Sequence, residues 1–350
     1  MHNVETITET PAKGDARSKA PVFVLGCPRS GTTLLYHMLL SAGNFAVYRA
    51  ESQVFNLLEP RFGNLNHPAN RRKLLAAWQE TELFRRTSLA RDEISQEVMT
   101  NCHNGGDFLR IVMETMARHQ GVMRWADCTP EHLLYLKRIK KTIPEAVVIH
   151  IIRDGRDVAL SLEKQAWIRP FPWDQKKTLE AAALYWEWIV NKGRQDGRTL
   201  GQDYIEVRFE DLVADPRKVL NSLSGFIGQE LDYEKIERVG IGSVSKPNSS
   251  FSVGKKTEDF SPVGRWKSSL STDQRERLEA LLGRTLLGLG YSLEHHANKI
   301  SPTASLQGMR LLYKSYFDLK LQLKKRLPFG KVLVSRDIPT FDPQLPRIES

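Results

Sequence analysis

The sequence predicts an α/β fold with a doubly wound parallel sheet. Short apolar runs rich in Val, Ile and Phe alternate with longer segments whose apolar residues recur every three or four positions. The short runs suit buried parallel strands, and the longer segments suit helices that cover both faces of the sheet. We expect strands at 21–26, 146–152 and 203–209. We expect helices at 32–43, 131–141, 158–164 and 179–192.

The loop after the first expected strand, GCPRSGTTLL (26–35), is the first candidate site. Gly26 and Gly31 have the spacing of the phosphate-binding motif G-x-x-x-x-G-K-[ST], but Thr32 stands where that motif has lysine. The amides at a helix N-terminus still attract an anion, and Arg29 can contact a terminal oxyanion group in bidentate fashion. The loop therefore predicts a nucleotide without a γ-phosphate, unless the glycines only form a tight turn.

A second motif, RDGRDVALS, runs from Arg153 to Ser161 and follows the strongest expected strand. Because parallel strands end at one edge of the sheet, Arg153 and Ser161 could converge on one phosphate close to the first loop. Two phosphate sites at one edge predict a nucleotide phosphorylated at both ends. The alternative is a set of surface ion pairs among Arg153, Asp154, Arg156 and Asp157.

The two motifs together resemble those of the sulfotransferases that use 3′-phosphoadenylyl sulfate (PAPS). PRSGTTLL (28–35) is similar to their 5′-phosphosulfate loop, and RDGRDVALS (153–161) is similar to their 3′-phosphate motif. The similarity extends through FEDLVADP (209–216) and GRWKSSLS (264–271), and it favours the bacterial and tyrosylprotein-type members. The resemblance implies a sheet of the P-loop nucleotide-binding type. It also implies transfer of a sulfuryl group from PAPS to a hydroxyl or amine without a metal.

The resemblance assigns the donor site to particular residues. The expected PAPS-binding residues are Arg29, Ser30, Gly31, Thr32, Thr33, Arg153, Ser161 and Arg265. Tyrosylprotein-type members have a lysine shortly before the proline that aligns with Pro130, and Cys128 stands there in this chain. Charge on the leaving group would then be stabilised by Arg29, which we count as catalytic, and by the loop amides. We expect Cys128 to be a buried structural residue.

Glu51 matches the place of the catalytic base in tyrosylprotein-type members, so we expect it to accept the proton of the attacking group. Glu131 and His132, just after Pro130, are the rival bases. The alternative function is a P-loop kinase or NTPase. It is disfavoured by Thr32 in place of lysine and by the lack of a strand that ends in a clear magnesium-binding aspartate.

Composition limits the partners and the compartment. The chain has 350 residues and a net charge of +10, which favours an anionic ligand. Its basic residues are not interleaved with aromatic ones, so we expect no nucleic acid partner. The three cysteines lack C-x-x-C spacing, which argues against a metal site and favours the reducing cytoplasm. No apolar run is long enough to span a membrane.

The chain divides into three parts on the same grounds. We expect a polar disordered leader at 1–20, the sulfotransferase domain at 21–295 and a basic tail at 296–350. A polar, strand-poor stretch at about 60–121 predicts a helical insertion on the acceptor side. The aromatic run at 165–173 could line an acceptor cleft or only pack a loop. The acceptor could be a lipid, a glycan, a small metabolite or a peptide.

The tail contains an expected amphipathic helix. Its apolar stripe would consist of Leu312, Tyr316, Leu319, Leu323 and Leu327. Lysines beside this stripe make the helix basic. We expect the helix to dock on the domain or on a second subunit, and we favour this over attachment to a membrane surface.

Overall fold

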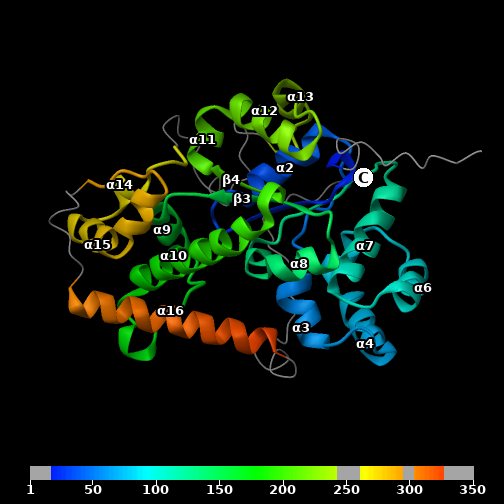
Figure 1. Cartoon of the computed structure of the whole chain (residues 1–350), viewed down its shortest axis with the longest axis horizontal. Coiled ribbons are helices and arrows are strands. Elements are labelled where there is room, and N and C mark those ends of the chain that lie inside the picture. Colours follow the sequence, from blue (N-terminus) through cyan, green and yellow to red (C-terminus); the bar gives the residue numbers. More distant parts are fainter. Residues whose placement is uncertain (1–16, 243–260, 295–302, 327–350) are drawn as a thin grey trace, which may run out of the picture.

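The computed structural model describes residues 17–242, 261–294 and 303–326 (Figure 1). Its centre is a parallel sheet with the strand order β2-β1-β3-β4. The strands are β1 (Val22–Gly26), β2 (Ala126–Asp127), β3 (Val147–Ile152) and β4 (Tyr204–Arg208). The three expected strands are confirmed. The edge strand β2 was not predicted, because two residues are too few to show a periodicity.

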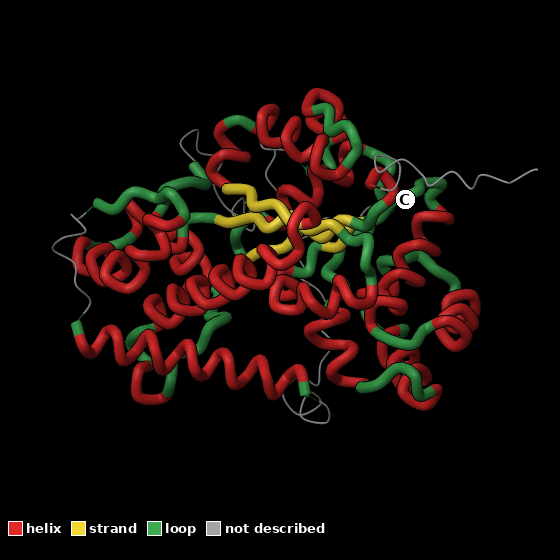
Figure 2. Tube along the Cα trace, in the orientation of Figure 1, coloured by secondary structure: helices red, strands yellow, loops and turns green. Residues whose placement is uncertain are grey.

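Helices cover both faces of this sheet, as Figure 2 shows, so the expected α/β class is confirmed. Successive strand residues point to opposite faces. Val22 and Val24 therefore belong to one core cluster, and Phe23 and Leu25 belong to the other. The first cluster contains residues of α2 (Thr32–Ala42), α11 (Phe209–Ala214), α12 (Pro216–Ile227) and α13 (Tyr233–Val239). The second contains residues of α9 (Gly155–Lys164), α10 (Thr178–Gly197) and α15 (Thr272–Gly288).

The stretch expected to be a helical insertion is helical in the structure. It contains α3 (Glu59–Phe62), α4 (Pro68–Trp78), α5 (Glu82–Arg85), α6 (Arg91–Asn101) and α7 (Gly105–His119). These helices form one end of the molecule in Figure 1. Trp78 holds them together, because its ring packs edge-on against Phe84 and Phe108 at centroid distances of 5.0 and 5.1 Å. A role of this part as a lid over the acceptor stays a prediction.

Shorter elements complete the chain. The remaining helices are α8 (Leu136–Thr142), α14 (Trp266–Ser269) and α16 (Ala304–Lys325). A π-helical turn, η1, spans Val54–Leu58, and 3₁₀ turns span η2 (Pro130–Tyr135), η3 (Pro172–Asp174) and η4 (Arg198–Asp203). The helix expected at 131–141 is therefore half 3₁₀ and half α. Its start at Pro130 suits the first turn of a helix, where no amide donor is needed.

The expected disorder of the leader is wrong for its last four residues, because residues 17–20 belong to the fold. Arg17 donates a hydrogen bond to the carbonyl of Phe226 at 2.8 Å and pairs with Asp203. The buried guanidinium of Arg124 donates to the carbonyl oxygens of Arg17 and Ala20. Residues 1–16 lie outside the described residues.

The expected docking of the C-terminal helix on the domain is confirmed, but the predicted face is wrong. The buried residues of α16 are Met309, Tyr313, Phe317 and Leu321. Each of the last three lies one or two positions after a residue of the predicted stripe. Phe317 packs against the aromatic rings of α10, with a centroid distance of 5.3 Å to Trp188. The larger aromatic area of this face explains why it is the one that docks.

A buried histidine in β3 predicts a loss of stability in acid. Burial lowers the pKa of His150 to about 3, so the native state holds it neutral. The unfolded chain takes up the proton as the pH falls below about 6.5, so native stability is lost between there and about pH 3. At pH 5 the loss amounts to about 2 kcal/mol.

We therefore expect His150→Gln to show a smaller difference than the wild type between the free energies of unfolding at pH 7.5 and pH 5. Glutamine can keep the hydrogen bond that joins His150 Nδ1 to the Tyr204 hydroxyl at 2.6 Å. Urea titrations at both pH values measure the difference. Equal differences for the two proteins would show that His150 is not the group that titrates.

Candidate active site

The loop between β1 and α2 has a backbone that requires its two glycines. A Cβ on Gly26 would lie 2.5 Å from the carbonyl oxygen of Ile151 in the neighbouring strand. Gly31 has a φ of 97°, and a Cβ there would lie 2.3 Å from the Phe209 ring. Both positions therefore exclude a side chain. The glycines hold the loop close to β3 and to the start of α11.

The loop opens the helix α2 without a side-chain cap. Gly31 is the N-cap residue, and it has no side chain that could accept a bond from the first-turn amides. The side chain of Ser30 is fully buried, and its Oγ has no hydrogen-bond partner among the described residues. The Thr33 side chain is exposed, whereas Thr32 is buried. Amides at a helix N-terminus together with a buried, unsatisfied hydroxyl fit an oxyanion ligand.

The structure brings the two predicted motifs into contact. Arg29 Nε donates to Ser161 Oγ at 3.0 Å, although the two residues are 132 positions apart in the sequence. Arg29 itself has a φ of 74°, which is an unfavourable conformation for a residue with a side chain. Its guanidinium lies 5.6 Å from the ring centroid of Trp167. The strained loop therefore holds Arg29 between α9 and the segment that follows α9.

Arg153 lies behind this contact at the end of β3. Only 2% of its surface is exposed, and its Nη1 donates to the carbonyl oxygen of Arg29 at 3.1 Å. Its Nη2 donates to the carbonyl oxygen of Pro262, whereas its Nε has no partner among the described residues. Burial lowers the pKa of Arg153, the carboxylates of Asp157 and Glu210 oppose this shift, and the charge of Arg265 adds to it. A buried guanidinium beside a second cation is well suited to an anionic ligand.

Arg265 reaches this place because Asp157 holds its backbone. The Asp157 carboxylate accepts hydrogen bonds from the amides of Gly264 and Trp266, at 2.8 and 2.9 Å. The same carboxylate lies 3.6 Å from Arg153 Nη2. The buried Asp157 carboxylate thus contacts both Arg153 and the backbone on either side of Arg265. The sequence analysis considered Asp157 only for a surface ion pair, so this positioning role was missed.

The rest of the second motif forms buried ion pairs instead of the surface pairs considered above. Arg156 Nη2 pairs with Asp154 at 2.8 Å, and Arg156 Nη1 pairs with Glu279 at 2.6 Å. Its guanidinium also lies 3.7 Å from the Trp266 ring centroid. Arg156 therefore joins α9 to α14 and α15. The first arginine of the motif faces the candidate site, and the second supports the fold.

Glu51, the expected base, is close enough to Cys128 for its charge to act on that buried thiol. Burial raises the pKa of the Cys128 thiol, and the charge of the Glu51 carboxylate raises it further. A hydrogen bond with the Thr32 side chain acts in the opposite direction on Cys128. The Glu51 side chain is exposed, and its charge and the Thr32 side chain both act on the Cys128 thiol. Gln53 Nε2 donates to the Glu51 carboxylate.

His132, one of the two rival bases, has no ring nitrogen free to take a proton from the acceptor substrate. Its side chain is fully buried, and its Nε2 accepts the amide hydrogen of Phe55 at 3.1 Å. Its Nδ1 lies 2.8 Å from Asp127 Oδ2, so Nδ1 carries the proton and donates. His132 therefore holds the segment that follows Glu51.

Thr129 holds the same segment from the other side. Its Oγ1 accepts the amide hydrogen of Gln53 at 3.2 Å and lies 3.3 Å from Ser52 Oγ. Gln53 has a φ of 54°, so this part of the backbone is strained. The Pro130 segment thus positions the residues around Glu51, a role that the sequence analysis missed.

Glu131, the other rival base, is hydrogen-bonded by neighbouring polar side chains. Its carboxylate accepts hydrogen bonds from Asn56 at 3.2 Å and from the Tyr185 hydroxyl at 3.3 Å. Burial alone would raise the pKa of Glu131, but Lys324 and these hydrogen bonds outweigh it and lower the pKa. Lys324 Nζ lies 3.7 Å from the carboxylate. Helix α16 therefore contributes a charged group to the neighbourhood of the candidate site.

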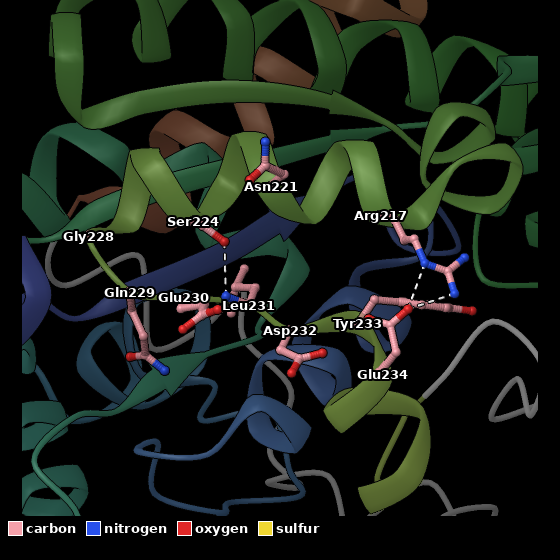
Figure 3. A pocket seen from close by; sticks show the side chains of 10 residues that line it. All are labelled: Arg217, Asn221, Ser224, Gly228, Gln229, Glu230, Leu231, Asp232, Tyr233 and Glu234. Atoms are coloured by element: carbon pink, nitrogen blue, oxygen red, sulfur yellow. Dashed lines mark hydrogen bonds and ion pairs between the residues drawn. The ribbon is translucent and has the colours of Figure 1, made fainter.

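A cavity of about 660 Å³ lies elsewhere, between α12 and α13 (Figure 3). Its polar groups are partly satisfied within the protein. Ser224 Oγ accepts the amide hydrogen of Leu231 at 2.9 Å, and Arg217 pairs with Glu234 at 2.7 Å. None of the expected site residues lines this cavity.

Neither a metal-binding cluster nor a membrane-spanning helix occurs among the described residues. Within 17–242, 261–294 and 303–326, no group of three or more His, Cys, Asp or Glu side chains could hold a metal ion. None of the helices in these ranges combines the length and the apolar character that crossing a bilayer requires.

Several known proteins are similar to this chain. Nodulation protein NoeE of Sinorhizobium fredii (strain NBRC 101917 / NGR234) is 24% identical over 338 residues, which are 88% of this chain and 76% of that protein. The sulfotransferase domain of the Synechococcus PCC 7002 olefin synthase is 19% identical, with a TM-score of 0.49 over 78% of this chain and 95% of that domain. Retinol dehydratase in complex with androsterone and inactive cofactor PAP is 15% identical, with a TM-score of 0.39 over 80% of this chain and 83% of that protein.

The chain also matches a protein family as a whole. Residues 21–233 match the Sulfotransferase family. This range contains the loop of Arg29 and the motif from Arg153 to Ser161, whose side chains meet in the structure. Since the match covers more than half of the 350 residues, the chain belongs to the sulfotransferase family.

Proposed function

We propose that the protein transfers a sulfuryl group from PAPS to a hydroxyl or amine of an acceptor. The observation that carries the proposal is the contact between Arg29 and Ser161, with Arg153 bonded to the carbonyl oxygen of Arg29. One loop at a helix N-terminus and one buried arginine thus lie side by side. This arrangement suits a nucleotide that carries anionic groups at both its 5′ and 3′ ends.

The donor would lie across this edge of the sheet. The 5′-phosphosulfate would be held by the loop amides with Arg29, Ser30, Gly31, Thr32 and Thr33. The 3′-phosphate would be held by Arg153, Ser161 and Arg265. The buried, unsatisfied Ser30 Oγ and Arg153 Nε support this assignment, because an oxygen of the 5′-phosphosulfate could satisfy the first and an oxygen of the 3′-phosphate the second.

The reaction would be an in-line transfer at sulfur. The acceptor oxygen or nitrogen forms a bond to sulfur as the bond from sulfur to the 5′-phosphate oxygen breaks. The Glu51 carboxylate takes the proton of the attacking group, and adenosine 3′,5′-bisphosphate leaves with its charge stabilised by Arg29 and the loop amides. No step in this scheme needs a metal ion.

Thermal unfolding in the presence of nucleotides tests the donor site. We expect adenosine 3′,5′-bisphosphate to raise the Tm by a few degrees without added metal, because saturation at about 100 Kd stabilises by about 2.7 kcal/mol. ATP with magnesium should raise the Tm much less, since Thr32 stands where a γ-phosphate site has lysine.

Equal stabilisation by the two nucleotides, or a strict need for magnesium, would contradict the proposal and favour a kinase or NTPase. Incubation of the protein with labelled PAPS and cell extract, followed by mass spectrometry of products that gain a sulfo group, would identify the acceptor. The cytoplasmic location stays a prediction.

A further inference from the structure

Two segments expose large apolar side chains next to each other. The segment 164–177 joins α9 to α10, and it exposes 53% of Trp167 and 71% of Trp173. Helix α16 exposes 44% of Leu312, 40% of Tyr316 and 60% of Leu319. In Figure 1, α16 runs along the lower edge of the molecule. We call these five exposed residues the outer aromatic surface.

Phe171 joins the two segments into one surface. Its ring stacks on Trp173 with a centroid distance of 4.9 Å and meets Tyr316 edge-on at 5.0 Å. Its amide donates to the Tyr313 hydroxyl at 3.1 Å. Tyr313 is buried on the face of α16 that docks on the domain. The outer aromatic surface is therefore braced from below by the packed core.

Basic side chains surround the outer aromatic surface. Lys164, Arg169, Lys176 and Lys320 are exposed. In the part of the chain that the structure describes, none of the four forms an ion pair, although Lys320 is close enough to Glu131 to help lower the pKa of that carboxyl. Lys320 Nζ lies 5.9 Å from the centroid of the Tyr316 ring.

Three acidic residues lie close in sequence to these four cations: Glu163 accepts a hydrogen bond from Thr178, and the other two are engaged with other lysines. Asp174 pairs with Lys177 at 2.9 Å, and Asp318 lies 3.3 Å from Lys192. The charge that remains around the outer aromatic surface is therefore positive.

We propose that the outer aromatic surface binds the surface of an anionic phospholipid bilayer. Tryptophan and tyrosine rings with apolar bodies and polar atoms suit the headgroup level of a bilayer. Lysine and arginine side chains near an anionic bilayer add electrostatic attraction. A second copy of the chain fits less well, because a symmetric interface would set the basic rim of one copy against that of the other.

Trp167 connects this surface to the candidate active site. Its ring lies 5.6 Å from the Arg29 guanidinium, and Arg29 belongs to the loop that would hold the donor. Adsorption through the outer aromatic surface would therefore bring the mouth of the site close to the bilayer. This last step rests on the proposed function, whereas adsorption itself does not.

Sedimentation with vesicles tests the proposal. We expect the full chain to bind vesicles of phosphatidylcholine mixed with phosphatidylserine, and to bind vesicles of phosphatidylcholine alone much more weakly. The variant Trp173→Ser/Leu319→Ser should bind the mixed vesicles at least about tenfold more weakly. Lys176→Glu should also weaken binding, and added salt should reduce what remains. Trp167 stays unchanged in these variants because it touches Arg29.

Matched control variants change exposed residues elsewhere. Met123 and Val239 are 69% and 49% exposed, so Met123→Ser/Val239→Ser should leave vesicle binding unchanged. Lys73 is exposed on α4, and Lys73→Glu controls for the change of charge. Stabilisation by adenosine 3′,5′-bisphosphate should persist in every variant, which keeps a failure of this proposal distinct from a failure of the proposed function.

Two results would overturn the proposal. One is equal binding of the full chain to both kinds of vesicle, or binding to neither. The other is a dimer in light scattering that Trp173→Ser/Leu319→Ser converts to a monomer, because the surface would then bind a second copy.

Discussion

Replacement of Glu51 by glutamine is expected to lower kcat about a hundredfold or more. Glutamine keeps the shape and the hydrogen bond from Gln53 but cannot take a proton from the attacking group. The measurement is the release of adenosine 3′,5′-bisphosphate from PAPS with an acceptor identified by the product screen. The affinity for the bisphosphate should stay nearly unchanged, because Glu51 is exposed and is not one of the expected donor-binding residues.

Variants of the rival bases are the controls for this result. His132→Asn should lower stability, because it alters the buried contacts of His132 with Asp127 and the Phe55 amide. Glu131→Gln should keep far more turnover than Glu51→Gln, because the neighbours of Glu131 lower its pKa and so its basicity. If Glu51→Gln kept near-normal turnover while Glu131→Gln lost it, the base would belong to the Pro130 segment.

Replacement of Arg153 by alanine is expected to weaken the binding of adenosine 3′,5′-bisphosphate by about 3 kcal/mol, which raises its Kd about 150-fold. The value lies at the upper end for a hydrogen bond to a charged group, because Arg153 is only 2% exposed. The affinity for 5′-AMP should change much less, since that nucleotide lacks the 3′-phosphate. Calorimetric titration of both nucleotides measures the difference.

The structure suggests a competing explanation that this experiment can separate. Arg153 also bonds the carbonyl oxygens of Arg29 and Pro262, so its loss could disturb the loop itself. Equal weakening of both nucleotides would show that Arg153 only supports the loop. Ser161→Ala provides a milder comparison, because it removes a hydroxyl that meets Arg29 and leaves Arg153 in place. Ser161→Ala should also lower the affinity for the bisphosphate more than the affinity for 5′-AMP.

The candidate donor site could be predicted from the sequence because each of its motifs is local. Gly26 and Gly31 are needed by a turn that joins adjacent elements, and the residues around that turn already specify a strand and a helix. Arg153 and Ser161 lie on one strand end and the helix after it, so their common orientation also follows from short-range geometry. That these motifs meet was an inference from parallel topology, and the contact of Arg29 with Ser161 confirms it.

The partners of individual side chains could not be predicted in the same way. The sequence pointed to Arg153 for the candidate site, but it did not show that Arg156 joins Asp154 to Glu279. The position of His132 in the sequence suggested a base, but its Nε2 accepts the backbone amide hydrogen of Phe55. Such choices depend on segments that are distant in the chain, and periodicity carries no information about them.

The sequence by itself determined the α/β class, the family and the two motifs of the candidate donor site. Each depends on the order and spacing of residues within a few turns of chain, where backbone geometry leaves few alternatives. Only the tertiary structure decided which face of α16 docks, because two apolar stripes on that helix compete for one surface. The stripe with Tyr313 and Phe317 docks on the aromatic rings of α10, and Leu312, Tyr316 and Leu319 stay exposed. Burial of the larger aromatic area there lowers the free energy more than the alternative would.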